Sequence, residues 1–460
     1  MILVWTLAGF VFASLFPLSV AHAQSPPASL VWPTVGVGAG YMRFEQLGIQ
    51  EGLSNNTVLA IWQDSLGFLW FGTREGLNKY DGYGFTVYTA ELNTPGTLSD
   101  SYITALAETP DGSLWIGTRN GGLNRFDLKE NTFEQISLTI EAISNPELQI
   151  NTLLVDSKSR LWVGTQHGLV RLDPGGDGLS GFQHDPNEES SLSDDEILSL
   201  FEDGEGQLWV GTSNGLNRFE HDGAFKRYLT GISSGVSVVT SITGDGGGNL
   251  WFGSQGGLIN FDPEQGTYRV FRHNPNDPGS LSSNHIKAIL RDRSGRLWIG
   301  FDDQGVNLLS DFIEGNLQVT PFQHKNYDPQ SLSKNTVRVL FEDEGGLLWF
   351  GTEGGGVNKA NPATRNFGYY QHEPGNPNSP AGENITALAF DGDRRSLWIG
   401  TAGMGISRMD LVTGEFVHYV HDPEDETSLG GDDITLLHLG ARGDLYVESQ
   451  GGGWKSMIPL

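Results

Sequence analysis

The sequence of 460 residues contains no cysteine, which excludes a disulfide framework and any thiolate nucleophile or metal ligand. Basic residues are also scarce, with 28 Lys and Arg against 56 Asp and Glu, and the formal net charge is -28. So acidic a chain repels the phosphates of nucleic acids and the surface of an anionic membrane. We therefore expect no nucleic-acid partner.

Long apolar runs are absent except at the N-terminus, and no stretch places its apolar residues at helical spacing. Residues 2–18 are almost wholly apolar, and Ala21-His22-Ala23 has the small-x-small form of a cleavage site. We expect a signal peptide over 1–23, a linker rich in Pro, Gly and Ser over 24–40, and a periplasmic location. The alternative is an uncleaved membrane anchor, which Pro17 and the shortness of the run disfavour.

What the sequence does contain is a repeat centred on Leu69-Trp70-Phe71-Gly72-Thr73. Successive copies lie 42 to 51 residues apart, and a degenerate ninth copy has Tyr446 at the position of the tryptophan. Eight of the twelve tryptophans occupy this slot: Trp70, Trp115, Trp162, Trp209, Trp251, Trp298, Trp349 and Trp398. A period in the forties is typical of a propeller or a solenoid.

One repeat, residues 99–136, reads as four short strands joined by tight turns. Residues 101–108 alternate apolar and polar, 113–118 form a continuous apolar run, and 123–126 and 132–136 follow after turns. A sheet this small covers both of its faces only by stacking on neighbours in a closed ring. We therefore predict an all-β protein, a β-propeller of four-stranded antiparallel blades with nine repeats.

The repeated tryptophan suits two roles. A ring wedged between neighbouring sheets buries about 150–250 Å² of surface, whereas an array of exposed rings would stack on carbohydrate or a cofactor. The slot lies in mid-strand in a fixed apolar context, which favours the structural role.

The repeats resemble a known family through several motifs: Gly52-Leu53-Ser54-Asn55-Asn56, the stretch from Asp64 to Thr73, and His184-Asp185-Pro186 with copies at His273, His324 and His421. They are similar to the two-component regulator propeller repeats of periplasmic sensor regions in bacterial hybrid histidine kinases and related diguanylate cyclases. The resemblance covers residues 41 to about 458. It implies signal sensing, often of oligosaccharides from polysaccharide breakdown, without a cofactor.

The same resemblance implies two seven-bladed propellers, a small β-sandwich, a transmembrane helix and a cytoplasmic output domain. This sequence shows no kinase signature and no cyclase motif. We expect output to come from a missing C-terminal kinase or cyclase module or from a separate signalling partner, and a dimeric receptor is one arrangement that the resemblance allows.

Nine repeats leave two ring sizes open. Residues 41–372 supply seven repeats, and residues 373–460 supply two more that would begin a second propeller. The segment 41–47 resembles a fourth strand, and it would complete the last repeat of a single nine-bladed ring. Analogy with the family favours seven blades plus two.

The positions that vary while the strands repeat directly follow the second strand of each repeat, at one face of a propeller. Their guanidinium, amide and carboxylate groups suit sugar hydroxyls, although a solvated rim of polar turns is the simpler interpretation. The candidate ligand-binding residues are Arg74, Arg119, Asn120, His167, Asn214, Gln255, Asp302, Asp303 and Glu353.

Enzymatic readings have weaker support. The doublets Asp194-Asp195, Asp302-Asp303 and Asp432-Asp433 point to opposite sides of a strand, so they are poor glycosidase pairs. The recurring His184, His273, His324, His372 and His421 would lie around a ring rather than converge on a metal, and Asp391-Gly392-Asp393 lacks the remaining ligands of a calcium loop.

We predict no catalytic residue, no metal and no cofactor. The leading hypothesis is a glycan-sensing propeller. The alternatives are a protein–protein interaction scaffold and a carbohydrate-active propeller enzyme.

Overall fold

The computed structural model describes residues 42–91, 94–128, 130–138, 148–174, 178–220, 223–232, 235–313, 316–362, 370–392, 395–411, 413–440 and 444–457. The expected signal peptide and linker lie outside these ranges. The described residues divide into two compact units, one up to Pro380 and one from Ala381. Among the described residues, no helix has both the length and the apolar character needed to cross a membrane.

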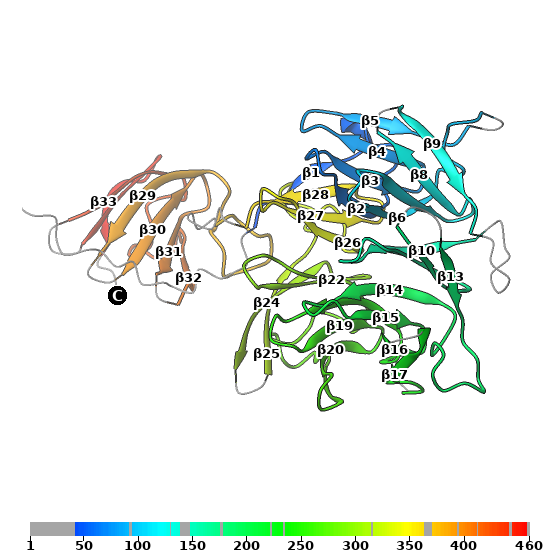
Figure 1. Ribbon diagram of the computed structural model, residues 1–460. Coiled ribbons are helices and arrows are strands. Elements are labelled where there is room, and N and C mark those ends of the chain that lie inside the picture. The colour runs from blue at the N-terminus through cyan, green and yellow to red at the C-terminus, as the bar shows by residue number, and fades with distance from the viewer. Residues whose placement is uncertain are drawn as a thin grey trace, which may run out of the picture. The chain divides into compact units, whose positions relative to one another are not determined.

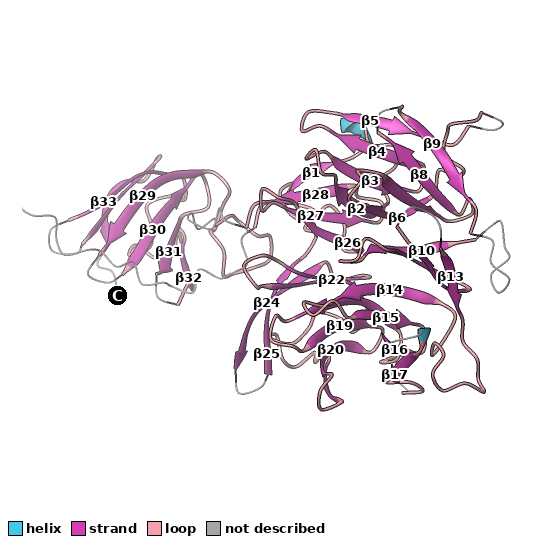
Figure 2. Ribbon diagram, viewed as in Figure 1, coloured by secondary structure: helices cyan, strands magenta, loops and turns pink. Residues whose placement is uncertain are grey.

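The larger unit consists of seven four-stranded antiparallel sheets (Figures 1 and 2). The first three sheets contain β2 (Val58–Gln63), β3 (Leu69–Thr73), β4 (Gly76–Tyr80) and β5 (Phe85–Tyr88); β6 (Ile103–Glu108), β7 (Leu114–Thr118), β8 (Leu123–Asp127) and β9 (Thr132–Ile136); and β10 (Ile150–Val155), β11 (Leu161–Thr165), β12 (Gly168–Leu172) and β13 (Leu179–Phe182).

The next three sheets contain β14 (Ile197–Glu202), β15 (Leu208–Thr212), β16 (Gly215–Phe219) and β17 (Phe225–Tyr228); β18 (Val239–Gly244), β19 (Leu250–Ser254), β20 (Gly257–Asp262) and β21 (Thr267–Phe271); and β22 (Ile286–Arg291), β23 (Leu297–Phe301), β24 (Val306–Ile313) and β25 (Asn316–Phe322). The seventh contains β26 (Val337–Glu342), β27 (Leu348–Thr352), β28 (Val357–Ala360) and β1 (Glu45–Leu47). A single-turn 3-10 helix, η1 (Ile49–Glu51), follows β1.

The ring closes after these seven sheets. The N-terminal strand β1 pairs antiparallel with β28, with Leu47 opposite Val357, and so supplies the fourth strand of the seventh sheet (Figure 1). The inner strand of the first sheet, β2, packs against β26 and β27 as β6 packs against β2 and β3. The strand at the N-terminus thus pairs with the seventh repeat and not with the ninth.

The second strand of each sheet is buried because a neighbouring sheet covers each of its faces. Seven of the eight repeated tryptophans are 0 to 7% exposed, and Trp115 is partly buried. Trp70 packs with Leu106 and Phe126 of the following sheet. Its indole Nε1 donates to Asp64 Oδ2 at 2.8 Å, which satisfies the polar atom that burial would otherwise leave unpaired. Equivalent bonds join Asp156 to Trp162, Asp203 to Trp209, Asp292 to Trp298 and Asp343 to Trp349.

In each of the first eight repeats, a β-branched side chain of the following sheet packs against the glycine of the Trp-x-Gly sequence. A Cβ added to such a glycine would lie 2.4 to 3.1 Å from that side chain, closer than packed carbon atoms approach. The pairs are Gly72 with Ile103, Gly117 with Ile150, Gly164 with Ile197, Gly211 with Val239, Gly253 with Ile286, Gly300 with Val337, Gly351 with Val58 and Gly400 with Ile434. The pair of Gly351 and Val58 joins the seventh sheet to the first.

The loops between sheets are fixed by recurring polar contacts. The buried Asn78 accepts from the backbone N–H of Ser54 at 2.8 Å and donates to Ser54 Oγ at 2.9 Å, which ties the loop to the third strand. Asn124, Asn217, Asn307 and Asn358 repeat the bond to a serine backbone N–H. His184 Nδ1 lies 2.6 Å from the carbonyl oxygen of Leu192, and His273, His324, His372 and His421 each contact the carbonyl oxygen eight residues on. These histidines therefore hold loops.

The smaller unit contains two sheets. The first is formed by β29 (Ile385–Asp391), β30 (Ser396–Thr401), β31 (Ile406–Asp410) and β32 (Phe416–Tyr419), and the second by β33 (Ile434–Leu439), β34 (Leu445–Ser449) and β35 (Gly453–Met457). In the second sheet Glu448 lies opposite Leu436, at the register position where Gly117 lies opposite Ala105. The ninth repeat therefore has Glu448 at the position where the other eight repeats have a glycine that contacts the following sheet.

The glycine contact generates a stability prediction. The substitution Gly117→Ala places a methyl group 2.6 Å from Ile150 Cγ2 in a buried site, and overpacking of this kind costs about 1–3 kcal/mol. We expect the free energy of unfolding in denaturant to fall by that amount. Gly204→Ala is the matched control, since a Cβ there meets nothing within 4 Å. Equal stability of the two variants would contradict this packing.

Candidate functional site

One face of the ring gathers polar side chains from the turns that follow the second strands and from the starts of the inner strands. Each inner strand of the ring begins with a β-bulge, where one residue is skipped in the register. Bulges re-aim a side chain at the rim of a sheet. In the sixth and seventh sheets the skipped residues are Lys287 and Arg338. The bulges thus place two cations beside the turns after β23 and β27.

A network of ion pairs crosses this face. Arg338 Nε donates to Glu353 Oε2 at 2.8 Å, and Arg74 Nη2 contacts Glu353 Oε1 at 2.7 Å. Arg338 Nη2 also lies 3.8 Å from Asp302 Oδ1, and Lys287 Nζ lies 3.5 Å from Asp302 Oδ2. The network therefore joins the sixth, seventh and first sheets and bridges the place where the ring closes.

Tyr102 extends the network to the second sheet. The half-buried ring precedes β6 and lies 5.0 Å from Arg119 Cζ and 6.0 Å from Arg74 Cζ, measured from the ring centroid. Both distances are within the range of cation–π attraction. Two guanidinium groups from neighbouring sheets therefore share one aromatic ring.

The charges in the network stabilise one another. A hydrogen bond with Tyr102 and the nearby Glu353 raise the pKa of Arg74 above its usual value. The hydrogen bond from Arg338, followed by the charges of Arg338 and Arg74, lowers the pKa of Glu353 below its usual 4.5. Arg74 and Glu353 are therefore both charged at neutral pH.

The structure brings together four of the nine predicted residues: Arg74, Arg119, Asp302 and Glu353. Among the described residues, no hydrogen bond or ion pair joins the remaining five to that network. Asn120 Nδ2 donates to Asp100 at 3.3 Å, Asn214 Oδ1 accepts from the N–H of Gly231 at 3.0 Å, and Gln255, His167 and Asp303 are exposed in their turns. The linked charges therefore lie on the sixth, seventh, first and second sheets, whereas the turns after β11, β15 and β19 carry no Arg, Lys, Asp or Glu.

Sequence reasoning missed Tyr102, Lys287 and Arg338. Tyr102 lies in the loop between sheets and the two cations lie in inner strands, whereas only the turns after the second strands were searched. The residue at the bulge differs from repeat to repeat: Lys287 and Arg338 align with Thr104 and Asn151. This variation is the signal in the sequence that could have identified the two cations.

The weaker enzymatic candidates are engaged in local structure. Asp194 accepts from the N–H of Glu196 and from Ser213 Oγ, and Asp195 accepts from the N–H of His184. Asp393 lies outside the described residues. Within the ranges that the structure describes, no three His, Asp or Glu side chains are grouped to hold a metal ion.

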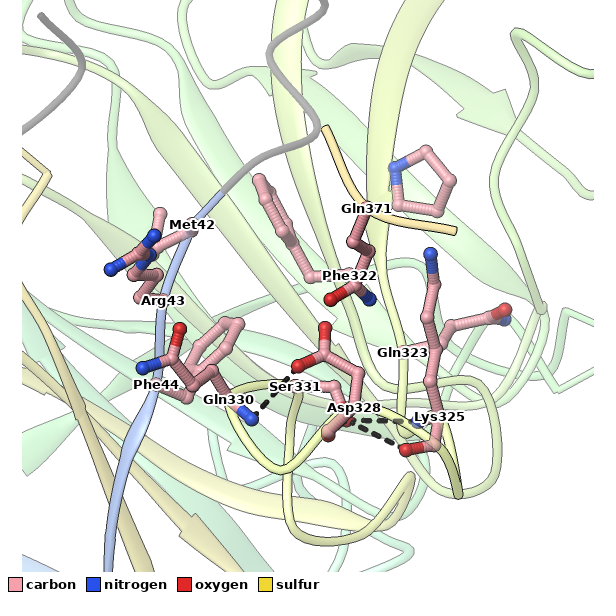
Figure 3. Close-up of a pocket in the computed structure, with 11 residues that line it drawn as sticks. Met42, Arg43, Phe44, Phe322, Gln323, Lys325, Asp328, Gln330, Ser331 and Gln371 are labelled. Carbon is pink, nitrogen blue, oxygen red and sulfur yellow. Dashed lines mark hydrogen bonds between the residues drawn. The ribbon is translucent and has the colours of Figure 1, made fainter. Parts of the chain in front are cut away.

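Two hollows lie elsewhere on the ring. A small one of about 80 Å³ lies where the N-terminal segment enters, between Met42, Arg43 and Phe44 on one side and Phe322 and Lys325 on the other (Figure 3). A wider one of about 480 Å³ lies between the third and fourth sheets.

Both hollows contain groups that structural contacts already engage. In the small one, Phe44 packs edge-on against Phe322 and Phe350, and Lys325 is paired with Glu373. In the wider one, Arg160 is paired with Asp156 at 2.6 Å and Arg171 with Asp173 at 3.0 Å.

Seven four-stranded sheets stacked in a ring that an N-terminal strand closes define a seven-bladed β-propeller. The sequence model of the family described as "Two component regulator propeller" matches residues 97–120, 191–214, 280–303 and 331–354. These four segments, which lie in the second, fourth, sixth and seventh sheets, match the two-component regulator propeller repeat.

The similarity of this chain to solved structures extends over most of its length. The extracellular domain of a protein described as a hybrid two component system of B. thetaiotaomicron is 26% identical, with a TM-score of 0.74, over 91% of this chain and 53% of that one. A virginiamycin B lyase from Staphylococcus aureus is 18% identical, with a TM-score of 0.51, over 70% of this chain and 99% of that one, which shows the fold alone.

Among curated proteins, "Histidine kinase P4" of Formosa agariphila is 55% identical over 38 residues, which are 8% of this chain and 3% of that protein. The chain thus spans about half of the B. thetaiotaomicron domain and a small part of the kinase. It has the architecture of a sensor-type propeller domain of hybrid two-component systems.

The network generates a prediction for pH. Because the folded pKa of Glu353 is depressed, its ion pairs contribute stability that is fully present above pH 4.5 and is lost as pH falls further. The pairs are partly exposed, so we expect a loss of about 1 kcal/mol or less. Thermal unfolding between pH 7 and pH 3 measures it. Glu353→Gln should lower stability at pH 7 and remove this share of the acid dependence, and an unchanged pH profile would contradict the assignment.

Proposed function

We propose that this chain is the ligand-sensing propeller of an exported receptor of two-component type, and that its ligand is an oligosaccharide bound at the polar face of the ring. The output activity, a kinase or a cyclase, would belong to a part of the receptor outside this sequence or to a separate signalling partner. The similarity to the extracellular domain of a hybrid two component system supports the receptor assignment.

The observation that carries the proposal is the contrast between a constant scaffold and a variable face. The tryptophans, glycines and loop asparagines repeat from sheet to sheet, and the residues after the second strands differ in charge and size. Functional residues held by a rigid scaffold show this contrast.

The chemistry of the face suits sugar hydroxyls. Hydroxyl groups donate and accept, so they pair both with carboxylates such as Asp302 and Asp303 and with guanidinium and amide donors such as Arg119 and Gln255. The side chains of Asp302, Arg338 and Lys287 are 29 to 38% exposed, so a ligand can reach them. Charge-assisted hydrogen bonds of this kind are about twice as strong as neutral ones.

Calorimetric titration of the chain with a panel of oligosaccharides tests the proposal. We expect at least one to bind and to raise the unfolding free energy by about 2.7 kcal/mol at a hundredfold excess over Kd. Arg338→Gln should weaken that binding, and Lys158→Gln, on a turn at the opposite end of the strands, should leave it unchanged. No heat and no thermal shift with any sugar would contradict glycan sensing, and turnover of the bound sugar would favour the enzyme alternative.

An interaction scaffold that self-associates is the second candidate, and the exposed face of β29 favours it. Ile385 and Leu388 are 45% and 59% exposed, whereas their register equivalents in the second sheet, Ile103 and Leu106, are 0% and 7% exposed. Exposed apolar patches commonly mark interaction surfaces.

Sedimentation velocity over a range of concentrations tests the scaffold. If β29 forms a dimer contact, Leu388→Glu should abolish self-association. Leu66→Glu, at a leucine that is 68% exposed on a turn of the ring, should not. A chain that stays monomeric throughout the range would exclude this candidate.

A further inference from the structure

The ring of Tyr102 holds two guanidinium groups that come from different sheets. Arg119 follows β7 in the second sheet and lies 5.0 Å from the ring centroid, and Arg74 follows β3 in the first sheet and lies 6.0 Å from it. The backbone supports this arrangement, because the N–H of Arg119 donates to the carbonyl oxygen of Tyr102 at 2.9 Å. The two guanidinium groups therefore lie at the same aromatic ring.

Carboxylates do not fully balance these cations. Glu353 is shared by Arg74 and Arg338, and Asp302 is shared by Arg338 and Lys287, so two carboxylates face three cations. Arg119 forms no ion pair with a carboxylate among the described residues. Its neighbour Asp100 is engaged by the N–H of Tyr102 at 3.1 Å and by the N–H of Asn120 at 2.8 Å.

The corresponding turns of the third to fifth sheets carry no cation. They present Gln166 and His167, Ser213 and Asn214, and Ser254 and Gln255. In a chain whose net charge is -28, two guanidinium groups at one aromatic ring are a local concentration of positive charge. Fields of this kind concentrate a ligand of opposite charge at one place.

We propose that Arg119 and Arg74, held against Tyr102, form a subsite for an anionic group of the ligand, so that the oligosaccharide of the proposed function is an acidic one. The inference rests on that function. A guanidinium donates two parallel hydrogen bonds to a carboxylate or a sulfate, which gives the subsite its selectivity. The hydroxyl groups of the same oligosaccharide contact the amide side chains of Asn214 and Gln255, in the turns of the fourth and fifth sheets.

Matched ligands test the subsite. The chain is titrated calorimetrically with a tri-uronide, with the neutral trisaccharide obtained by reducing its carboxyl groups, and with a sulfated form of that trisaccharide. A charge-assisted hydrogen bond contributes enough free energy for us to expect about tenfold to hundredfold weaker binding of the neutral sugar. Whichever anionic form binds more tightly identifies the anion.

Variants locate the effect. Arg119→Gln should weaken binding of the anionic sugar about tenfold or more and leave binding of the neutral sugar unchanged, while Arg119→Lys, which keeps the charge but loses the two parallel hydrogen bonds, should restore only part of the affinity. Lys158→Gln removes the same charge at the other end of the strands and should change neither. Thermal unfolding of each variant checks that the ring is intact.

The outcomes separate the two proposals. If the neutral sugar binds as tightly as both anionic forms, or if Arg119→Gln weakens all three alike, the anionic subsite is wrong and the glycan-sensing function stands. If none of the three binds but another sugar of the panel does, the subsite is again wrong. If no sugar binds at all, the proposed function fails and this inference fails with it.

Discussion

The contact between a glycine in one sheet and a β-branched side chain in the next is the interaction on which the ring depends. It occurs in every sheet of the ring, and it leaves no room for a single methyl group. Tryptophan fills the space beside it. In five of the seven sheets an aspartate in the preceding turn accepts from the indole N–H, and in the second sheet Thr109 does. The angle between neighbouring sheets is set at these points, because the backbone of one strand approaches the side chain of the next without a spacer.

Much of this framework could be predicted from the sequence, because repetition makes a structural role visible. The Leu-Trp-x-Gly-Thr run, the four strands of residues 99–136 and the all-β propeller follow from period and alternation. Ring size did not follow, since a strand at residues 41–47 fits equally well beside the seventh or the ninth repeat. The strand β1 pairs with β28 because the free edge of β28 lies beside it once the ring has formed. The sequence alone does not show which strand edge will lie there.

The candidate site was predicted in part for a related reason. Arg74, Arg119, Asp302 and Glu353 were found because a turn can be located from the strand before it. Arg338 and Lys287 were not found, because a bulge within an inner strand has no signature in a single repeat. Tyr102 was missed because the loops between sheets differ in length. Residues placed by a bulge or by a loop of variable length were therefore harder to identify than residues in a turn that directly follows a strand.

The pairing of Leu47 with Val357 has a consequence for how the protein folds. The six intervening sheets each consist of segments that are neighbours along the chain, so they can form in succession as the polypeptide becomes available. The seventh cannot be completed until both ends of this long stretch exist together, and the loop that must then be closed is almost the whole unit. Closure therefore carries the largest loop-closure entropy of any strand pairing in the unit, and without it β28 is an open edge that can pair with another chain.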